Sequence, residues 1–242
     1  MVNRMVIIFI DLDDTLILQE KTRIESRGTV NLKGQMIKII KKYNFLDSYI
    51  DELNAFDRAS LLWNAIMDHL YELKISDNEI SLIRKELDEV IARHEREDHE
   101  NSFLSEETIP FLEQLRKEGY TLIMLTNTSR FELDQIFSKY NLTKYFNGSI
   151  TRDDVIKIKP DPEGIKKMLN KLGEDSFVII DDLDYGVMAA KESLKLGYRS
   201  YTILVDRRKY KKQILKQLNP DAVVSSLKEI PELLKKLPRL MK

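Results

Sequence analysis

The hydrophobic pattern opens with a short continuous apolar run at residues 5–10, MVIIFI. A run this short and this rich in Ile and Val is typical of a strand that is buried on both faces. The chain then becomes acidic at Asp11, Asp13 and Asp14. Side chains two apart in an extended segment point the same way, so Asp11 and Asp13 are expected to project together. Neighbouring carboxylates repel unless a cation or a shared proton relieves them, which suggests a hard metal ion such as Mg²⁺.

A helical pattern of apolar residues follows, between residues 33 and 97. The apolar residues recur at steps of three and four, as one buried stripe along a helix requires. They predict three helices, at residues 36–40, 53–70 and 80–91. Ser76 and Asp77 provide a start signal for the third helix. No strand pattern is found here, so the region is expected to form an all-helical module.

The pattern changes after residue 106, where a helix, a glycine and a strand recur three times. The predicted pairs of helix and strand are 109–117 with 121–125, 162–172 with 177–180, and 186–196 with 201–205. The glycine that follows each helix stands where a C-cap favours a left-handed residue. Further short strands are expected at 147–150 and 222–224, before a last helix at 227–237.

Helices that alternate with strands imply a parallel sheet with right-handed crossovers. We therefore expect an α/β fold, with a doubly wound, Rossmann-like parallel-sheet core and an inserted all-helical cap domain. The expected boundaries place residues 1–18 and 101–242 in the core and residues 19–100 in the cap. The chain of 242 residues, 43% of them hydrophobic, is large enough for both.

Composition narrows the classes of function. The formal net charge of -1 gives no basic field that would attract nucleic acid. The chain has no Cys, which excludes disulfides, thiol catalysis and Cys-based zinc sites. No stretch approaches the ~20 apolar residues of a membrane span, and the first apolar run is too short for a signal peptide. We expect a cytoplasmic protein without a membrane or nucleic-acid partner, and the oligomeric state stays open.

Polar side chains follow two further predicted strands. Thr126 and Asn127 end the strand at 121–125, and Asp181 and Asp182 end the strand at 177–180. In an open parallel sheet, functional groups gather at the carboxyl ends of the strands. These residues are therefore expected to lie beside the acidic cluster at the end of the first strand.

A balancing positive charge is expected from Lys159, within the segment KIKPDP at residues 157–162. Pro160 restricts the backbone of Lys159, and Pro162 suits the first turn of the next helix, so this loop should be stiff. The glycine-rich phosphate loops of nucleotide-binding proteins and the Gly-x-Ser-x-Gly elbow of esterases are both missing from the sequence. A glycine-cradled nucleotide cofactor and esterase chemistry are therefore disfavoured.

In this order and spacing, the residues resemble the haloacid dehalogenase-like (HAD) hydrolase superfamily, most of whose members are phosphatases. The matching positions are Asp11, Asp13 and Thr15 for the first motif, Thr126 for the second, Lys159 for the third, and Asp181 with Asp182 for the fourth. Each motif is weak alone, and the ordered set is specific. The helical insertion between the first two motifs resembles the C1-type cap of the phosphatase branch.

The resemblance implies a mechanism and a set of roles. Asp11 would attack phosphorus and form an aspartyl-phosphate, while Asp13 would act as general acid and then as general base. Mg²⁺ would be held by the Asp11 carboxylate, the Asp13 backbone carbonyl and Asp182. Thr126, Lys159 and the backbone of Asn127 would hold the transferring oxygens. The implied function is Mg²⁺-dependent hydrolysis of a small phosphorylated metabolite.

One position departs from the pattern of the family. Many members carry a second Asp four residues after the position of Asp182, where this chain has Gly186. Asp181 stands where those members have Gly, so the chain resembles the acidic-pair variant of the fourth motif. Either Asp181 or Asp184 could replace the missing acid near the metal.

Several alternatives stay open at this point. A phosphotransferase or phosphomutase would use the same residues with a bound hydroxyl as the acceptor. A phospho-accepting signalling or binding domain without turnover is a second alternative, although such receiver modules lack a helical cap. A dehalogenase is disfavoured, because that branch lacks the second Asp of the first motif. Candidate cap residues that would read the substrate are Arg23, Arg27, Arg58 and Trp63, of which Trp63 fits a core position better.

Overall fold

The computed structural model describes residues 6–19 and 29–237. The chain divides into two compact units, which we call the core unit and the helical unit. The core unit comprises residues 1–18, 103–155 and 159–242, and the helical unit comprises residues 19–102 and 156–158. The short segment 156–158 was not assigned to the helical part by the sequence.

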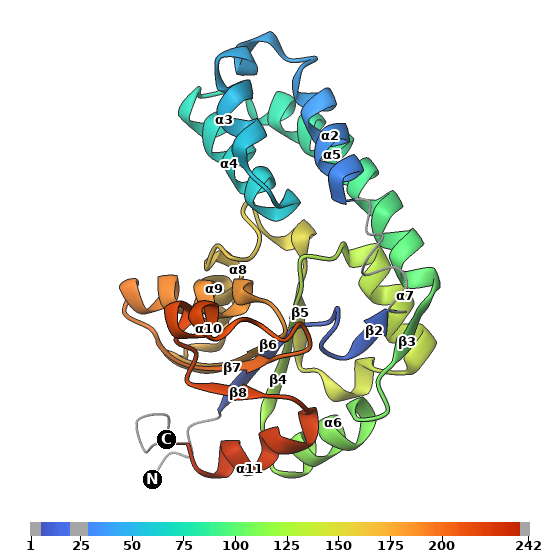
Figure 1. Cartoon of the computed structure of the whole chain (residues 1–242), viewed down its shortest axis with the longest axis vertical. Helices are drawn as coiled ribbons and strands as arrows, with labels where there is room; N and C mark the ends of the chain where they lie inside the picture. Colours follow the sequence, from blue (N-terminus) through green and yellow to red (C-terminus); the bar gives the residue numbers. More distant parts are fainter. Residues whose placement is uncertain (1–5, 20–28, 238–242) are drawn as a thin grey trace. The chain divides into compact units, whose positions relative to one another are not determined.

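The core unit is built on a six-stranded parallel sheet (Figure 1). Its strands in chain order are β1 (Ile7–Ile10), β4 (Thr121–Leu125), β5 (Gly148–Ile150), β6 (Ser176–Asp181), β7 (Arg199–Val205) and β8 (Ala222–Val224). The spatial order is β5-β4-β1-β6-β7-β8, so β1 lies between β4 and β6. All four residues of β1 are buried, as expected for a central parallel strand with both faces covered.

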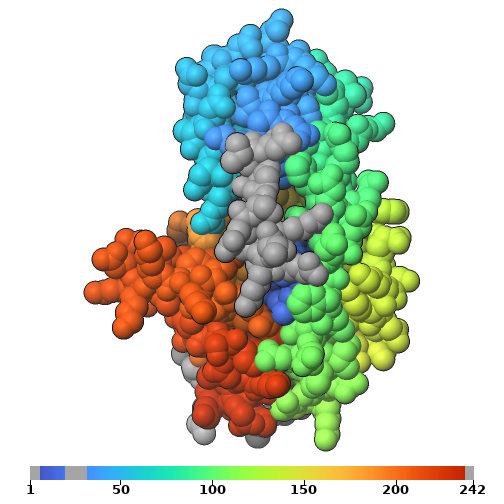
Figure 2. All heavy atoms as spheres, turned by 45° about the vertical axis from the view of Figure 1, so that its right-hand side comes forward, coloured from blue at the N-terminus to red at the C-terminus, as the bar shows by residue number. Residues whose placement is uncertain are grey.

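Helices cover both faces of this sheet. In chain order they are α6 (Thr108–Lys117), α7 (Arg130–Tyr140), α8 (Glu163–Leu172), α9 (Asp184–Lys195), α10 (Lys212–Leu218) and α11 (Ile230–Lys235). Short 3₁₀ helices occur at η2 (Thr143–Tyr145), η3 (Arg152–Asp154) and η4 (Leu227–Glu229). One hydrophobic cluster joins Ile8 and Ile10 of β1 to α6, α7 and α11. Helix α10 has no buried residue and stands out at the surface of the core unit (orange-red, Figure 2).

The predicted α/β fold with a helical insertion is confirmed. Strands β4 and β8 have the predicted bounds, and β6 and β7 extend the predicted strands by one or two residues. The three glycines predicted to follow helices all have positive φ, at 84°, 72° and 90°. The apolar runs and the glycines thus located the sheet, because a buried parallel strand leaves a continuous apolar signature.

The helical unit contains α2 (Thr29–Ile40), η1 (Asn44–Tyr49), α3 (Ile50–Ala55), α4 (Ala59–Glu72) and α5 (Asp77–Glu100). The predicted single helix at 53–70 is wrong, because the chain is extended at Phe56 and Arg58 and forms two helices instead. The predicted start of the third helix is confirmed, since Ser76 Oγ accepts a hydrogen bond from the Glu79 N–H at 3.4 Å.

The hydrophobic pattern of the sequence did not predict two short strands. Strands β2 (Ile17–Gln19) and β3 (Ser102–Leu104) form a separate two-stranded sheet at the places where the chain passes from one unit to the other. With three residues each, they are too short for a periodic pattern. Among the residues that the structure describes, no helix combines the length and the apolar character needed to cross a membrane.

Candidate active site

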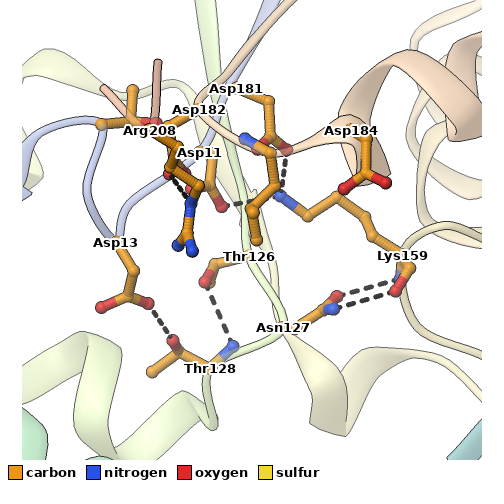
Figure 3. A network of polar contacts seen from close by, with 12 residues as sticks. Asp11, Asp13, Thr126, Asn127, Thr128, Lys159, Asp181, Asp182, Asp184 and Arg208 are labelled. Atoms are coloured by element: carbon orange, nitrogen blue, oxygen red, sulfur yellow. Dashed lines mark hydrogen bonds and ion pairs between the residues drawn. The ribbon is translucent and has the colours of Figure 1, made fainter. Parts of the chain in front are cut away.

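Three neighbouring strands bring the predicted residues to one edge of the sheet. Asp11 follows β1, Thr126 follows β4, and Asp181 is the last residue of β6. The Asp11 N–H donates to the Ile180 carbonyl at 2.9 Å, which continues the pairing of β1 with β6 one residue past the end of β1. The backbone of the sheet therefore fixes where each of these side chains starts (Figure 3).

Lys159 joins the acids that follow two of these strands. Its Nζ donates to Asp11 Oδ1 at 2.6 Å and to Asp181 Oδ2 at 2.7 Å (Figure 3). Only 6% of Lys159, 7% of Asp11 and 1% of Asp181 is exposed, so water screens these ion pairs weakly. The structure thus places the predicted lysine against the predicted nucleophile, together with an acid whose pairing with Lys159 the sequence did not predict.

Burial changes the proton affinity of these groups. Burial raises the pKa of Asp11 to about 8, with Lys159 opposing the shift and the charges of Asp181 and Asp13 adding to it. Burial also raises the pKa of Asp182 well above its ordinary value, and the charges of Asp181 and Asp11 add to the shift. For Lys159, burial alone would lower the pKa, and the paired carboxylates of Asp11 and Asp181 outweigh it and raise the pKa.

A group of three buried carboxylates could hold a cation. One oxygen from each of Asp11, Asp181 and Asp182 lies within 4.8 Å of the others. Asp182 Oδ1 is buried and has no hydrogen-bond partner among the described residues. Hard divalent cations such as Mg²⁺ prefer carboxylate oxygens, so this donor set and its unpartnered oxygen fit such an ion. The carboxylates of Asp13 and Asp184 are not part of this group of described residues, whereas that of Asp181 is.

Arg208 lies beside the same carboxylates and was not predicted. Its Nε donates to Asp182 Oδ2 at 3.0 Å (Figure 3). Its second terminal nitrogen donates to Asp14 Oδ2 at 3.2 Å. The other oxygen of Asp182 is left for another partner. In the sequence Arg208 belongs to the basic run RRKYKK, which gives no sign of a buried contact.

Asp13 points toward the end of β4. Its Oδ2 accepts a hydrogen bond from Thr128 Oγ1 at 2.8 Å, and the Thr128 N–H donates to Thr126 Oγ1 at 3.1 Å (Figure 3). Thr128 therefore links the predicted general acid and base to the predicted phosphate-binding hydroxyl. Thr128 was not predicted from the sequence, although a hydroxyl three residues past a strand end was a usable signal.

Asn127 contacts Lys159 through its side chain. Its Oδ1 accepts from the Lys159 N–H at 2.9 Å, and its Nδ2 donates to the Lys159 carbonyl at 2.9 Å (Figure 3). The Asn127 carbonyl accepts in turn from the guanidinium of Arg152 at 2.7 Å. Arg152 is 1% exposed. The side chain of Asn127 thus holds the backbone of the lysine, a role that the sequence had not assigned.

The structure describes two of the four cap residues that were candidates for recognising the substrate. Arg23 and Arg27 lie outside the described residues. Arg58 is half-buried and precedes the first turn of α4. Trp63 is fully buried within the helical unit, and its Nε1 donates to the Ile156 carbonyl at 3.0 Å. The interpretation of Trp63 as a core residue is confirmed.

Comparison with curated proteins gives partial matches. The chain is 30% identical over 112 residues to pyrophosphatase PpaX of Bacillus velezensis, covering 44% of this chain and 52% of that protein. It is 24% identical over 119 residues to pyrophosphatase PpaX of Halalkalibacterium halodurans, covering 48% and 53%. The match therefore spans about half the length of these relatives.

Comparison with solved structures covers nearly the whole chain. A HAD phosphatase from Thermococcus onnurineus aligns with a TM-score of 0.56 at 19% identity, covering 95% of this chain and 98% of that one. A 2-haloacid dehalogenase from Pseudomonas syringae aligns with a TM-score of 0.57 at 19% identity, covering 96% and 99%. At such identities the likeness shows the fold alone, and the fold is shared by both chemistries.

A family model described as haloacid dehalogenase-like hydrolase matches residues 5–193. The matched range contains the ordered set of Asp11, Thr126, Lys159 and Asp182. The chain belongs to the haloacid dehalogenase-like hydrolase family.

Proposed function

We propose that this protein is a Mg²⁺-dependent phosphatase that hydrolyses a small phosphomonoester through an aspartyl-phosphate on Asp11. The observation that carries the proposal is the buried cluster of Asp11, Lys159, Asp181 and Asp182 at the carboxyl ends of β1 and β6. An acid that is buried beside both a lysine and a cation site can act as a nucleophile toward an anionic substrate.

The first step forms the covalent intermediate. A carboxylate oxygen of Asp11 attacks phosphorus in line, the new O–P bond forms, and the bond from phosphorus to the leaving oxygen breaks. Asp13 gives its proton to that oxygen, so an alcohol departs. The hydrogen bond from Thr128 at 2.8 Å supports this role because it fixes the orientation of the Asp13 carboxylate.

The second step releases phosphate. Asp13, now a carboxylate, takes a proton from water as the water oxygen attacks phosphorus. The bond between Asp11 and phosphorus breaks, and the Asp11 carboxylate is restored. Lys159 and Thr126 donate hydrogen bonds to the phosphoryl oxygens during both steps, where positioning and charge supply most of the rate enhancement.

The cation site would be formed by Asp11 and Asp182, with the backbone carbonyl of Asp13. Asp181 supports the same site by holding Lys159 and by contributing to the carboxylate group. Mg²⁺ bound there would screen the anionic substrate from the Asp11 carboxylate.

Hydrolysis of p-nitrophenyl phosphate tests the proposal. We expect turnover with Mg²⁺, loss of turnover in excess chelator, and no turnover for Asp11→Asn. Wild-type turnover by folded Asp11→Asn would refute Asp11 as the nucleophile. If folded wild-type protein gives no turnover, a phosphate-mimicking fluoride complex separates the remaining cases. Binding at Asp11 would point to a selective cap or a binding role, and absence of binding would refute the proposal.

Assays with a panel of phosphate esters then identify which ester is the preferred substrate. Sugar phosphates, phosphoglycolate, nucleotides and glycerol phosphates are the natural candidates. Inorganic pyrophosphate belongs in the panel because the curated relatives are named pyrophosphatases. Addition of free sugars as acceptors separates hydrolysis from phosphoryl transfer, because a transferase would form a new sugar phosphate.

A further inference from the structure

The segment that precedes Lys159 is held by helix α4. Residues 156–158 lie between β5 and α8 in the sequence and belong to the helical unit. Trp63 donates to the Ile156 carbonyl at 3.0 Å, and Asp68 accepts from Lys157 Nζ at 2.9 and 3.1 Å. All three residues of the segment are thus tied to one helix, the third of them through Asn64.

Asn64 makes two hydrogen bonds to the backbone of Ile158. Asn64 Oδ1 accepts from the Ile158 N–H at 2.9 Å, and Asn64 Nδ2 donates to the Ile158 carbonyl at 2.8 Å. Asn127 makes the same pair of bonds to the next residue, Lys159, at 2.9 Å each. Residues in an antiparallel ladder exchange N–H···O bonds in the same paired way. Two consecutive backbone units are therefore each fixed by a side-chain amide.

These bonds bear on the position of the lysine head group. Lys159 has a long, flexible side chain, and its Nζ must lie within hydrogen-bond distance of both Asp11 and Asp181. The position of Nζ depends on where the backbone of Lys159 is fixed. Displacement by about 1 Å of a group that acts on a transition state can cost ~10²-fold in rate.

We propose that Asn64 is a positioning residue that sets the placement of Lys159 through the backbone of Ile158. This inference deepens the proposed function, on which it rests for the role of Lys159. It gives the helical unit a part in catalysis through the lysine loop, because the peptide bond between Ile158 and Lys159 is where the chain passes from the helical unit to the core unit.

The kinetic test compares Asn64→Leu with Asp68→Ala. Leu has a similar size and removes both bonds to Ile158, whereas Asp68→Ala removes an ion pair of the adjacent residue Lys157. We expect Asn64→Leu to lower kcat about tenfold, the equivalent of ~1.4 kcal/mol, with a smaller change in KM and unchanged Mg²⁺ binding. Asp68→Ala should stay within about twofold of wild type, as expected for an ion pair near the surface.

Amide hydrogen exchange at Ile158 and Lys159 gives a readout that does not depend on activity. We expect Asn64→Leu to speed hydrogen exchange at both amides, even though the Lys159 N–H is itself bonded to Asn127. Asp68→Ala should change the exchange rate of neither amide. Asn64→Asp keeps the acceptor for the Ile158 N–H, so its exchange rates and its kcat should lie between those of wild type and Asn64→Leu. This variant keeps the test valid if Asn64→Leu folds poorly.

The outcomes separate the two proposals. Faster exchange at Ile158 alone, with kcat and exchange at Lys159 unchanged, would overturn the positioning role of Asn64. If wild-type protein hydrolyses no phosphate ester and binds no fluoride complex at Asp11, the phosphatase proposal fails. If exchange at Lys159 still follows the Asn64 variants in that case, the positioning of Lys159 by Asn64 is supported.

Discussion

Gly186 leaves the space that the side chain of Asp181 fills. A Cβ atom on Gly186 would lie 2.4 Å from Asp181 Cβ and 2.7 Å from Asp181 Oδ2, closer than real Cβ contacts. Asp181 uses the same Oδ2 to bind Lys159 at 2.7 Å. In this geometry an acid at position 181 and a side chain at position 186 exclude each other. This gives a physical reason for the departure of the chain from the Asp that many family members carry at position 186.

Gly186→Ala should therefore lower both stability and activity. Overpacking of this kind costs ~1–3 kcal/mol in the free energy of unfolding, and displacement of Asp181 should loosen its contact with Lys159. Urea unfolding and kcat measure the two effects. Gly34→Ala is the matched control, because Gly34 also lies in a helix and a Cβ there would meet no atom within 4 Å. The control should be neutral or stabilising by up to ~1 kcal/mol. An equally stable Gly186→Ala protein would contradict the steric explanation.

Lys159→Ala should lower kcat by at least ~10²-fold, the usual effect of losing one preorganised stabilising group. Lys157→Ala is the control, since Lys157 Nζ is paired with Asp68 within the helical unit. Steady-state kinetics with p-nitrophenyl phosphate measures both variants. A change below threefold for Lys159→Ala, with a large loss for Lys157→Ala, would move the role to Lys157.

Thr128→Val should lower kcat about tenfold while leaving Mg²⁺ binding unchanged. The substitution keeps the shape of the side chain and removes the hydrogen bond to the Asp13 carboxylate, and bonds to charged groups contribute ~1.5–3 kcal/mol. Thr128→Ser keeps the hydroxyl and should retain most of the activity. If both variants lose activity equally, the methyl group and its packing matter more than the hydrogen bond to Asp13.

The metal-free protein should lose stability as the pH rises. Burial raises the pKa of Asp11 from 3.8 to about 8, so between these values the folded protein keeps a proton that the unfolded chain has released. The free energy of unfolding due to Asp11 therefore falls with increasing pH across this window. Mg²⁺ competes with that proton, so it should stabilise the protein more near pH 8 than near pH 5.

Urea unfolding in chelator, near pH 5 and near pH 8, measures this effect against Asp11→Asn. The Asn variant cannot take up the charge, so it should gain stability relative to wild type as the pH rises. A constant difference between the two proteins at both pH values would contradict the raised pKa of Asp11. The Mg²⁺-dependent part of the stability should also be smaller in Asp11→Asn.

The sheet and the three strand ends could be predicted because buried parallel strands are continuous apolar runs and their carboxyl ends share one edge. That rule is sufficient to predict that Asp11, Thr126 and Asp181 lie together. Lys159 was predicted on a separate ground. The acids need a balancing positive charge, and two prolines indicate that the loop of Lys159 is stiff. The local sequence was thus enough to predict the site residues that the backbone of the sheet positions directly.

The sequence did not reveal two sets of contacts between distant segments, nor one local break between helices. Arg208 binds Asp182 and Asp14 from a basic run that looks like solvated surface. The break between α3 and α4 falls at Phe56 and Arg58, without the glycine or proline that usually announces a helix end. The bonds of Asn64 to Ile158 join residues 94 positions apart, which no local pattern reports.

The membership of residues 156–158 in the helical unit has a consequence for protein engineering. Excision of residues 19–102, or their exchange for the cap of a relative, would remove α4 and leave Ile156, Lys157 and Ile158 without the partners described above. The cap is therefore not a self-contained module in the sequence. We expect a functional chimera of this protein to need the segment before Lys159 transplanted together with the cap, because α4 holds all three residues of that segment.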